Sequence, residues 1–212
     1  MKRKDIVKTI NNLTGAAGHK EVLKVYNSQK KLPRGYEVKW HDAWCATTVS
    51  AVFLMNGCDI FTECSCVQMV EKAKKAGIWE ENDAYIPKEG DVVLYDWQDT
   101  GKGDDKGAPD HVGIVVEVKS QTFVVREGNK NNTIGNRTMK FNAPKIRGFI
   151  LPKYEPETVQ KKKSNEEVAR EVIEGKWGTG EARKQKLKAA GYSYTKIQDV
   201  VNELMKKGGK KS

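Results

Sequence analysis

The side chains best suited to covalent chemistry are a cysteine and a histidine that lie far apart in the chain. Cys45 follows Trp44 and begins the run "CATTVSAVFLMNG", whose apolar residues recur at steps of three and four and predict a helix. A thiol on the first turn of a helix faces unpaired backbone N–H groups and the positive end of the helix dipole, which favour its thiolate. Cys45 is therefore a candidate nucleophile, although most free cysteines are simply buried.

A cysteine nucleophile needs a base, and the base needs a partner that orients it. His111 begins the predicted strand "HVGIVVEV", and the following predicted strand ends in "REGN", which contains Glu127 and Asn129. A short "KSQ" turn pairs these strands and brings the end of the second beside the start of the first. Either Glu127 or Asn129 can then hold the tautomer of His111. The remaining histidines are His19 and His41.

His41 competes with His111 as the base because it precedes Cys45 closely in the sequence. It falls in the loop-like segment 31–42 and has no partner strand, so we expect it to line the cleft instead. Trp40 and Trp44 are expected to form a wall of the cleft or to pack beneath it.

The elements that would position these residues change from helices to strands along the chain. Helical patterns come first, and β-branched and aromatic runs separated by Gly, Asp and Asn follow after Pro87. This order predicts an α+β domain over residues 1–154. The expected helices are 4–27 with a break at 14–18, a helix from Cys45 to Gly57, and 65–77; the expected strands are 91–97, 111–118, 122–127 and 146–152.

A second, smaller module follows a change in composition. Residues 155–165 are polar and charged and are typical of a linker. Residues 166–207 show helical periodicity three times, broken at "GKWGTG" and "AGYS", and predict a three-helix module. We expect residues 208–212 to be a disordered tail.

Charge and composition narrow the classes of function. The net charge of +10 favours polyanionic partners such as nucleic acid, anionic membranes or an anionic bacterial wall. No apolar run approaches the ~20 residues that cross a bilayer, and the N-terminus does not have the form of a secretory signal. We therefore expect synthesis in a bacterial cytoplasm and no stable membrane insertion. The four cysteines fit a reducing compartment better than a disulfide scaffold.

Four blocks of sequence carry a family resemblance. "WCATTVSAVFLMNG", "PKEGDVVLYDW", "DHVGIVVEV" and "REGN" are similar, in this order, to segments of the CHAP family of cysteine, histidine-dependent amidohydrolases and peptidases. The resemblance covers roughly residues 5–154 and implies a papain-like fold that hydrolyses amide bonds of peptidoglycan. It implies Cys45 as nucleophile, His111 as base, and Glu127 or Asn129 as the orienting residue, with no cofactor. The bond is either the N-acetylmuramoyl-L-alanine amide or a peptide bond.

The C-terminal module resembles the short wall-binding repeat at the end of phage lysins, through "VAREVIEGKWGTGEARKQKLKAAGYSYTKIQDVVN". That resemblance implies recognition of the muropeptide and glycan of the wall without choline. Together the two resemblances imply a phage or prophage endolysin that waits in the cytoplasm until a holin opens the membrane. Aromatic faces and a guanidinium suit sugars and a carboxylate, so the candidate wall-binding residues are Trp177, Arg183, Tyr192 and Tyr194.

Several alternatives have weaker support. Cys58, Cys64 and Cys66 have no fourth ligand nearby and lack zinc-knuckle spacing, and the acid-rich segment 96–110 does not fit a calcium loop, so we expect no metal. A catalytically silent wall-binding protein remains an alternative. A helix-turn-helix protein that binds DNA is another, but "GKWGTG" is longer than that motif's turn and the basic residues alternate with acidic ones. We therefore expect no nucleic-acid partner. Nothing in the sequence indicates an oligomeric state.

Overall fold

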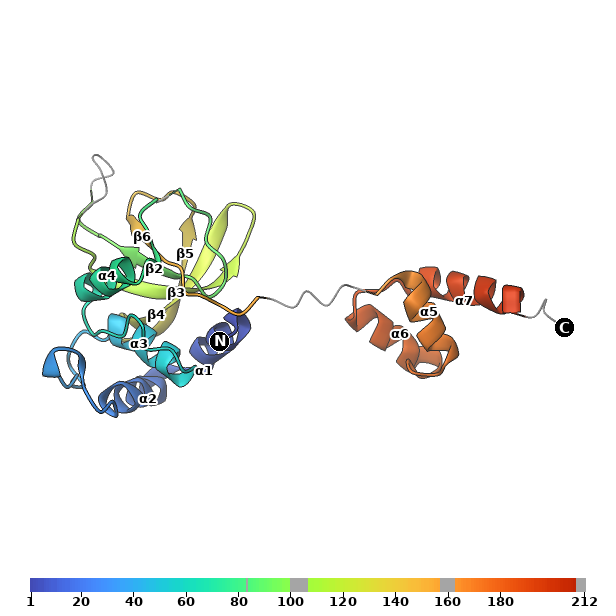
Figure 1. The fold of residues 1–212 in the computed structure, drawn as a ribbon, viewed down its shortest axis with the longest axis horizontal. Helices are drawn as coiled ribbons and strands as arrows, with labels where there is room; N and C mark the ends of the chain where they lie inside the picture. The colour runs from blue at the N-terminus through green and yellow to red at the C-terminus, as the bar shows by residue number, and fades with distance from the viewer. Residues whose placement is uncertain (83, 100–106, 157–162, 209–212) are drawn as a thin grey trace. The chain divides into compact units, whose positions relative to one another are not determined.

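The computed structural model describes residues 1–82, 84–99, 107–156 and 163–208. The chain divides into two compact units, residues 1–157 and residues 158–212, so the division falls inside the predicted linker (Figure 1). The predicted disordered tail lies almost wholly outside the described residues.

The N-terminal unit begins with helices and continues into strands, as predicted. Its helices are α1 (Arg3–Asn12), α2 (Gly15–Asn27), the short 3₁₀ helix η1 (Pro33–Gly35), α3 (Cys45–Met55) and α4 (Cys66–Lys75). Its strands are β1 (Trp79–Glu80), β2 (Val92–Tyr95), β3 (His111–Val118), β4 (Thr122–Lys130), β5 (Thr133–Lys140) and β6 (Ile146–Ile150).

The strands form one antiparallel sheet in the order β1-β6-β2-β3-β4-β5. The α+β prediction is therefore confirmed, and β3 and β4 form the expected hairpin around the "KSQ" turn. Strands β1 and β5 were not predicted. Asn131 and Asn132 both have positive φ in the tight turn that joins β4 to β5, a conformation typical of two-residue hairpin turns.

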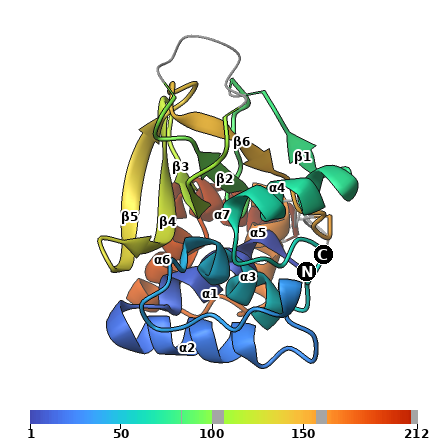
Figure 2. The same cartoon turned by 90° about the vertical axis from the view of Figure 1, so that its left-hand side faces the viewer.

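Helices α1, α2 and α3 lie along one side of the sheet (Figures 1 and 2). Their apolar residues join one face of the strands in a large core cluster, while the opposite face forms a second cluster that includes Tyr95, Phe123 and Phe149. Within α3, every residue from Cys45 to Phe53 is buried. Because core side chains are close-packed, α3 cannot shift freely, and its first turn is held at a fixed place beside the sheet.

The C-terminal unit contains α5 (Asn165–Ile173), α6 (Gly180–Ala189) and α7 (Tyr194–Gly208). Ser164 and Glu167 form a reciprocal capping box at the start of α5, which satisfies backbone donors that the helix leaves free. The core of this unit is small and apolar; its buried members are Val168, Ala169, Val172, Leu187, Ile197 and Val201. Across the described residues, no helix has both the length and the apolar character required to span a bilayer.

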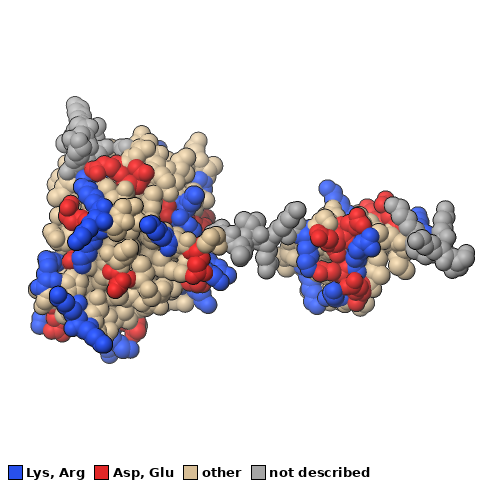
Figure 3. Space-filling model, in the orientation of Figure 1, with Lys and Arg blue, Asp and Glu red and all other residues tan. Residues whose placement is uncertain are grey.

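Basic and acidic side chains are interspersed on the visible face of both units (Figure 3). The C-terminal unit and linker contain 14 Lys and Arg against 9 Asp and Glu from residue 155 onward, which is half of the net charge of +10. The excess positive charge is therefore shared between the units rather than gathered on one of them.

Candidate active site

Cys45 is the first residue of α3, at the place where the helix leaves backbone donors unpaired. The residue before it, Trp44, provides no side-chain cap. The backbone N–H of Ala46 instead hydrogen-bonds the Cys45 sulfur. The first turn of α3 therefore donates a backbone hydrogen bond to the sulfur of Cys45, where another helix would donate to the hydroxyl of a capping residue.

His111 and Glu127 are brought together by the register of β3 and β4. Ile114 pairs with Arg126, so the same register sets Gly113 opposite Glu127 and leaves His111 diagonally beside it. The Nε2 atom of His111 lies 3.1 Å from Oε2 of Glu127. With Nε2 occupied by the carboxylate, Nδ1 is left for the hydrogen bond that the ring makes with Cys45.

Two glycines make this approach possible. A Cβ on Gly113 would lie 2.7 Å from Cγ of Glu127, and a Cβ on Gly128 would lie 1.9 Å from Oγ1 of Thr48 in α3. Gly113 leaves the room through which the Glu127 side chain passes toward His111. Gly128 lets the backbone of β4 pack directly against α3 and thus sets the distance between this helix and the sheet.

Arg137, in β5, completes the set of charged groups. Its Nε donates to Oε1 of Glu127 at 2.7 Å, and its guanidinium lies 4.6 Å from the ring centre of Trp97 and 5.7 Å from that of Tyr95. Glu127 is fully buried, and each of its oxygens has a charged or chargeable partner. A buried carboxylate needs such partners to remain ionised.

The pKa of the Cys45 thiol is lowered and that of the His111 imidazole is raised, and both shifts favour an ion pair. A hydrogen bond from Cys66 holds the pKa of Cys45 well below its ordinary value; burial opposes this effect, and the hydrogen bond and charge of His111 reinforce it. Burial disfavours the charged ring of His111, but its hydrogen bonds to Cys45 and Glu127 outweigh burial and raise its pKa to about 9. Both shifts favour a thiolate beside an imidazolium.

The pKa of Glu127 falls below its ordinary value. Burial alone would raise this pKa, but the hydrogen bonds from His111 and Arg137 and their charges outweigh burial. Glu127 is thus the ionised partner that a protonated His111 requires.

The other candidates of this region are Asn129, His41 and His19. Asn129 has a φ of 56° at the irregularity between Glu127 and Lys130, and among the contacts of the described residues it makes no hydrogen bond to His111. His41 is exposed in its loop. His19 is buried and stacks on Trp44 at 3.9 Å and on Trp40 at 4.1 Å between ring centres. Trp44 therefore supports the start of α3 from beneath.

Two neighbours of the site were missed in the sequence. Arg137 lies in β5, and the "KNNT" turn followed by an alternating strand is the signal that could have located it. Cys66, the first residue of α4, lies with its sulfur 3.8 Å from that of Cys45. No spacing rule predicts that contact, because it depends on how α3 and α4 pack.

In the C-terminal unit, the aromatic candidates contribute to packing. Trp177, Tyr192 and Tyr194 are half-buried against the helical core. Trp177 donates from Nε1 to Glu171, and Arg183 donates from Nε to the carbonyl oxygen of Gly178 at 2.8 Å. The indole N–H of Trp177 and the guanidinium of Arg183 therefore already have intramolecular partners in the absence of a bound wall fragment.

One cavity of the C-terminal unit, of about 550 Å³, includes Trp177 among its walls. Lys176, Lys186 and Glu171 line it together with two alanines. This cavity offers an aromatic face and the ammonium group of Lys186, which are groups suited to a sugar that carries a carboxylate, whereas the ammonium group of Lys176 is paired with Glu174 at 2.6 Å. Arg183, Tyr192 and Tyr194 are not among its lining residues.

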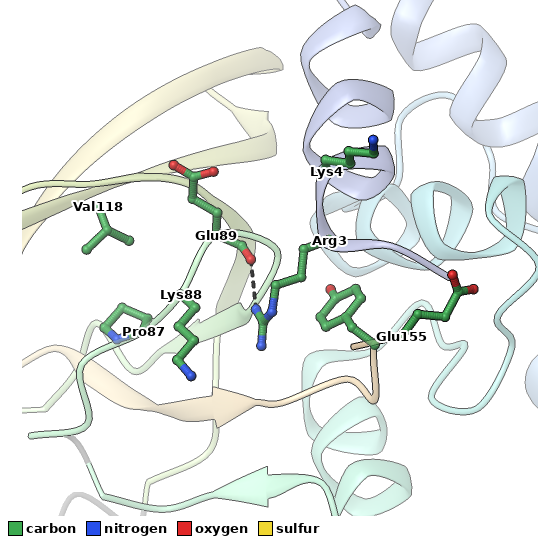
Figure 4. Close-up of a pocket in the computed structure, with 8 residues that line it drawn as sticks. Arg3, Lys4, Pro87, Lys88, Glu89, Val118 and Glu155 are labelled. Atoms are coloured by element: carbon green, nitrogen blue, oxygen red, sulfur yellow. Dashed lines mark hydrogen bonds between the residues drawn. The ribbon is translucent and has the colours of Figure 1, made fainter. Parts of the chain in front are cut away.

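A cavity of about 650 Å³ lies at the other end of the sheet from His111 (Figure 4). It includes Val118, the last residue of β3, whereas His111 is the first. Arg3 reaches across this cavity to the carbonyl oxygen of Glu89 and is paired with buried Asp91 at 2.7 Å. Its most prominent cation is thus already neutralised, and the cavity is separate from the thiolate site.

Among the described residues, no group of three or more His, Cys, Asp or Glu side chains is arranged to hold a metal ion. All four cysteines are free thiols. Cys66 contacts Cys45, while Cys64 accepts a hydrogen bond from Arg34 at 3.1 Å, so the three later cysteines do not converge on one point. Part of the acid-rich segment 96–110 lies outside the described residues.

The fold and the site define an α+β unit with a thiol and an imidazole in contact, joined to a small helical module, and the chain was compared with known families. Residues 35–129 match the CHAP domain, and residues 166–205 match the CW_7 repeat. The chain therefore carries a CHAP domain followed by a cell-wall repeat, an endolysin-like architecture. A CHAP domain is a peptidoglycan amidase or peptidase, and a CW_7 repeat binds the cell wall. No curated protein and no solved structure was found to match the chain.

Proposed function

We propose that this protein hydrolyses amide bonds of bacterial peptidoglycan through a thiolate of Cys45, with His111 as its proton carrier and Glu127 as the residue that orients His111. The observation that carries this proposal is the continuous set of contacts from Arg137 through Glu127 and His111 to Cys45. If Glu127 formed only structural ion pairs with Arg137 and His111, no thiol would be needed beside His111 at the start of α3.

The reaction begins from the ion pair. The Cys45 thiolate attacks the amide carbonyl and forms a tetrahedral oxyanion, and first-turn backbone N–H groups of α3 are suited to stabilise it. Removal of one such donor generally costs ~10²–10³ in rate. His111 then gives its proton to the leaving amine, so that the carbon–nitrogen bond breaks and an acyl-enzyme remains.

Water completes the reaction. His111, now neutral, accepts a proton from the water that attacks the thioester, and the release of Cys45 restores the thiolate. Glu127 stays ionised throughout and stabilises the imidazolium, because Arg137 holds its second oxygen. The amide cut is either that between N-acetylmuramic acid and L-alanine or one within the peptide.

The C-terminal unit would hold the enzyme on its substrate. The cavity beside Trp177 is a candidate site for a muropeptide, with Lys186 placed to meet a carboxylate, while Lys176 would have to exchange its partner Glu174 for the ligand. Arg183, Tyr192 and Tyr194 would act outside that cavity. A polymeric substrate makes such tethering effective, because it raises the local concentration of bonds near Cys45.

Substitution at the two reacting residues tests this function. We expect Cys45→Ala and His111→Ala to lose detectable lysis of purified peptidoglycan while they retain wall binding and the far-ultraviolet circular dichroism of the parent protein. Cys58→Ser is the matched control, since Cys58 lies near the other end of α3 and should leave lysis unchanged. Undiminished lysis by Cys45→Ala would refute the mechanism, and mass spectrometry of the released fragments identifies the bond.

A further inference from the structure

Cys66 is a second thiol in direct contact with the nucleophile, and the proposed mechanism gives it no chemical step. The two sulfurs are 3.8 Å apart although the residues are separated by 21 positions. Both side chains are buried, with exposed fractions of 6% for Cys45 and 8% for Cys66. Each is also the first residue of its helix, so the starts of α3 and α4 converge on this one pair of sulfurs.

The pair shares one proton. The pKa of Cys66 is raised well above its ordinary value, first by its hydrogen bond to Cys45 and then by burial. The opposite shifts of the two pKa values favour Cys66 as the thiol that donates and Cys45 as the thiolate that accepts. Two equivalent buried thiols in an ordinary core would both stay protonated, so the ionisation of one marks this pair as reactive.

We infer that Cys45 and Cys66 form a redox-active dithiol, a modification site at which a peroxide converts the nucleophile to an intramolecular disulfide. The inference rests on the proposed function only for its effect on lysis. A disulfide requires the sulfurs to approach by about 1.8 Å from their present separation. We expect rotation about the side-chain bonds of Cys66 to supply this approach while α3 stays packed.

The chemistry balances in two steps. The Cys45 thiolate attacks a peroxide oxygen, the O–O bond breaks, and hydroxide leaves as sulfur is oxidised to a sulfenic acid. The Cys66 sulfur, whose proton passes to a nearby base, then attacks the Cys45 sulfur. The S–S bond forms, the S–O bond breaks, and water is released. The peroxide supplies both oxidising equivalents.

The consequence is reversible protection. A lone sulfenic acid proceeds with further peroxide to a sulfinic acid, which thiols do not reduce. Cys66 is close enough to trap the sulfenic acid first, as a disulfide that a dithiol reopens. The enzyme would then be silent under oxidising conditions and active again after reduction.

The test uses the full chain with Cys58→Ser and Cys64→Ser, which leaves Cys45 and Cys66 as its two cysteines. The reduced protein is treated with hydrogen peroxide in excess of the two equivalents that a sulfinic acid requires, alkylated, and measured by intact mass. We expect the loss of two hydrogens and no alkylation. Trypsin alone leaves residues 40–72 in one peptide, whereas added cleavage after Glu63 gives two peptides that the disulfide still joins.

Activity gives the second measurement. Peroxide should lower the lysis rate at least about tenfold in this double variant, and dithiothreitol should restore most of it. The matched control adds Cys66→Ser, which leaves Cys45 without a trapping thiol. The control should lose lysis under the same treatment, fail to recover, and show Cys45 carrying two added oxygens. A Cys66→Ala variant repeats the control if serine disturbs the folding of α4.

The outcomes separate the two proposals. If the double variant gives Cys45 sulfinic acid without the joined peptides, or if the Cys66→Ser control recovers equally well, the dithiol inference is wrong while Cys45 can still be the nucleophile. If the joined peptides form but Cys45→Ala lyses peptidoglycan normally, the modification site stands and the catalytic proposal fails.

Discussion

The two units of this chain differ in what they bury. The CHAP unit encloses charged and titratable groups in its interior, whereas the described residues of the helical unit bury apolar side chains alone. The buried charged and imidazole groups of the first unit are His19, Glu63, Asp91, Asp96, His111, Glu127 and Arg147. The ion pairs of the second unit lie at its surface, as between Glu166 and Arg170 or Glu174 and Lys176.

The difference between the two units shows that, within the described residues, only one of them gives up free energy of folding to hold charged groups in its interior. Burial of a charge is costly unless partners replace its water, and it stabilises a fold less than apolar packing of the same volume. In the CHAP unit, burial of the Glu127 carboxylate carries this free-energy cost, and the buried carboxylate holds the ring of His111 in one orientation. The described residues of the helical unit bury no charged group, and its small apolar core is supported by the capping box at the start of α5.

The largest expected effect follows from removal of the buried charge at Glu127. Glu127→Ala should lower the rate of lysis by ~10²–10⁴, because His111 loses the group that fixes its ring. It should also lower the free energy of unfolding of the CHAP unit by roughly 3 kcal/mol, since a buried partner of Arg137 is lost. Turbidity loss and urea unfolding measure the two effects.

Glu127→Gln is the sharper comparison at this position. The amide retains an acceptor for His111 but removes the negative charge, so the pKa of His111 should fall and the thiolate should lose its imidazolium partner. We expect partial retention of stability with a loss of lysis nearly as large as that of Glu127→Ala. Equal lysis by Glu127→Gln and the parent would show that orientation alone, without charge, is sufficient.

The apolar core of the helical unit is expected to be the most sensitive part of that unit. Leu187 is fully buried in α6, and Leu187→Ala should cost ~2–5 kcal/mol, enough to unfold a module with so few buried residues. Sedimentation with purified walls should show lost binding, while the CHAP unit keeps its own unfolding transition. Gln185→Ala, on the exposed side of the same helix, is the matched control and should bind normally.

The next prediction concerns pH, which should affect the contributions of His111 and Cys45 differently. The folded pKa of His111 is about 9, above the ordinary value of 6.5, so its protonation stabilises the fold fully below pH 6.5. That stabilisation should be lost as pH rises through about 9. Lysis should decline over the same range because the leaving amine loses its proton donor.

Alkylation of Cys45 should behave differently from lysis. The thiolate remains ionised above pH 9, so the rate of inactivation by iodoacetamide should stay level while lysis falls. An alkylation rate that rises steeply with pH up to about 9 would mean that the resting site is a neutral thiol and imidazole. In His111→Ala the alkylation rate should show a more alkaline transition.

The meeting of Cys45, His111 and Glu127 could be predicted because the position of each residue depends on local rules. A helix start at Cys45, a strand start at His111 and a short hairpin after it bring three segments to one edge, and the register of β3 and β4 agrees with this reasoning. Glu127 and Asn129 could not be separated in the sequence. The separation depends on the irregularity after Glu127, where Asn129 adopts a positive φ.

The remaining neighbours depend on long-range packing. Arg137 reaches Glu127 from β5, a strand whose pairing with β4 depends on the turn at Asn131 and Asn132, and Cys66 reaches Cys45 only through the packing of α4 against α3. In the helical unit, the sequence suggests aromatic ligand contacts, but Trp177 and Tyr192 also pack edge to face at 6.1 Å between ring centres. The sequence does not distinguish an aromatic ring that packs from one that binds.

The smallest expected effect comes from comparing two ion pairs, one in each unit, that have the same length but different burial. Arg3 and Asp91 in the CHAP unit and Arg170 and Glu166 in α5 are both joined at 2.7 Å. Asp91 is fully buried and also accepts from Tyr85 and the backbone of Lys88, whereas both members of the second pair are more than half exposed. Asp91→Ala should therefore cost ~3 kcal/mol and loosen α1 from the sheet.

Glu166→Gln should change the free energy of unfolding by no more than about 0.5 kcal/mol, because water screens an exposed pair and its side chains lose entropy when they meet. Urea unfolding in low and high salt measures both variants. Salt should reduce the already small effect of Glu166→Gln and leave that of Asp91→Ala nearly unchanged. Equal costs for the two variants would mean that burial does not govern these ion pairs, and the contrast between the units would then rest on their cores alone.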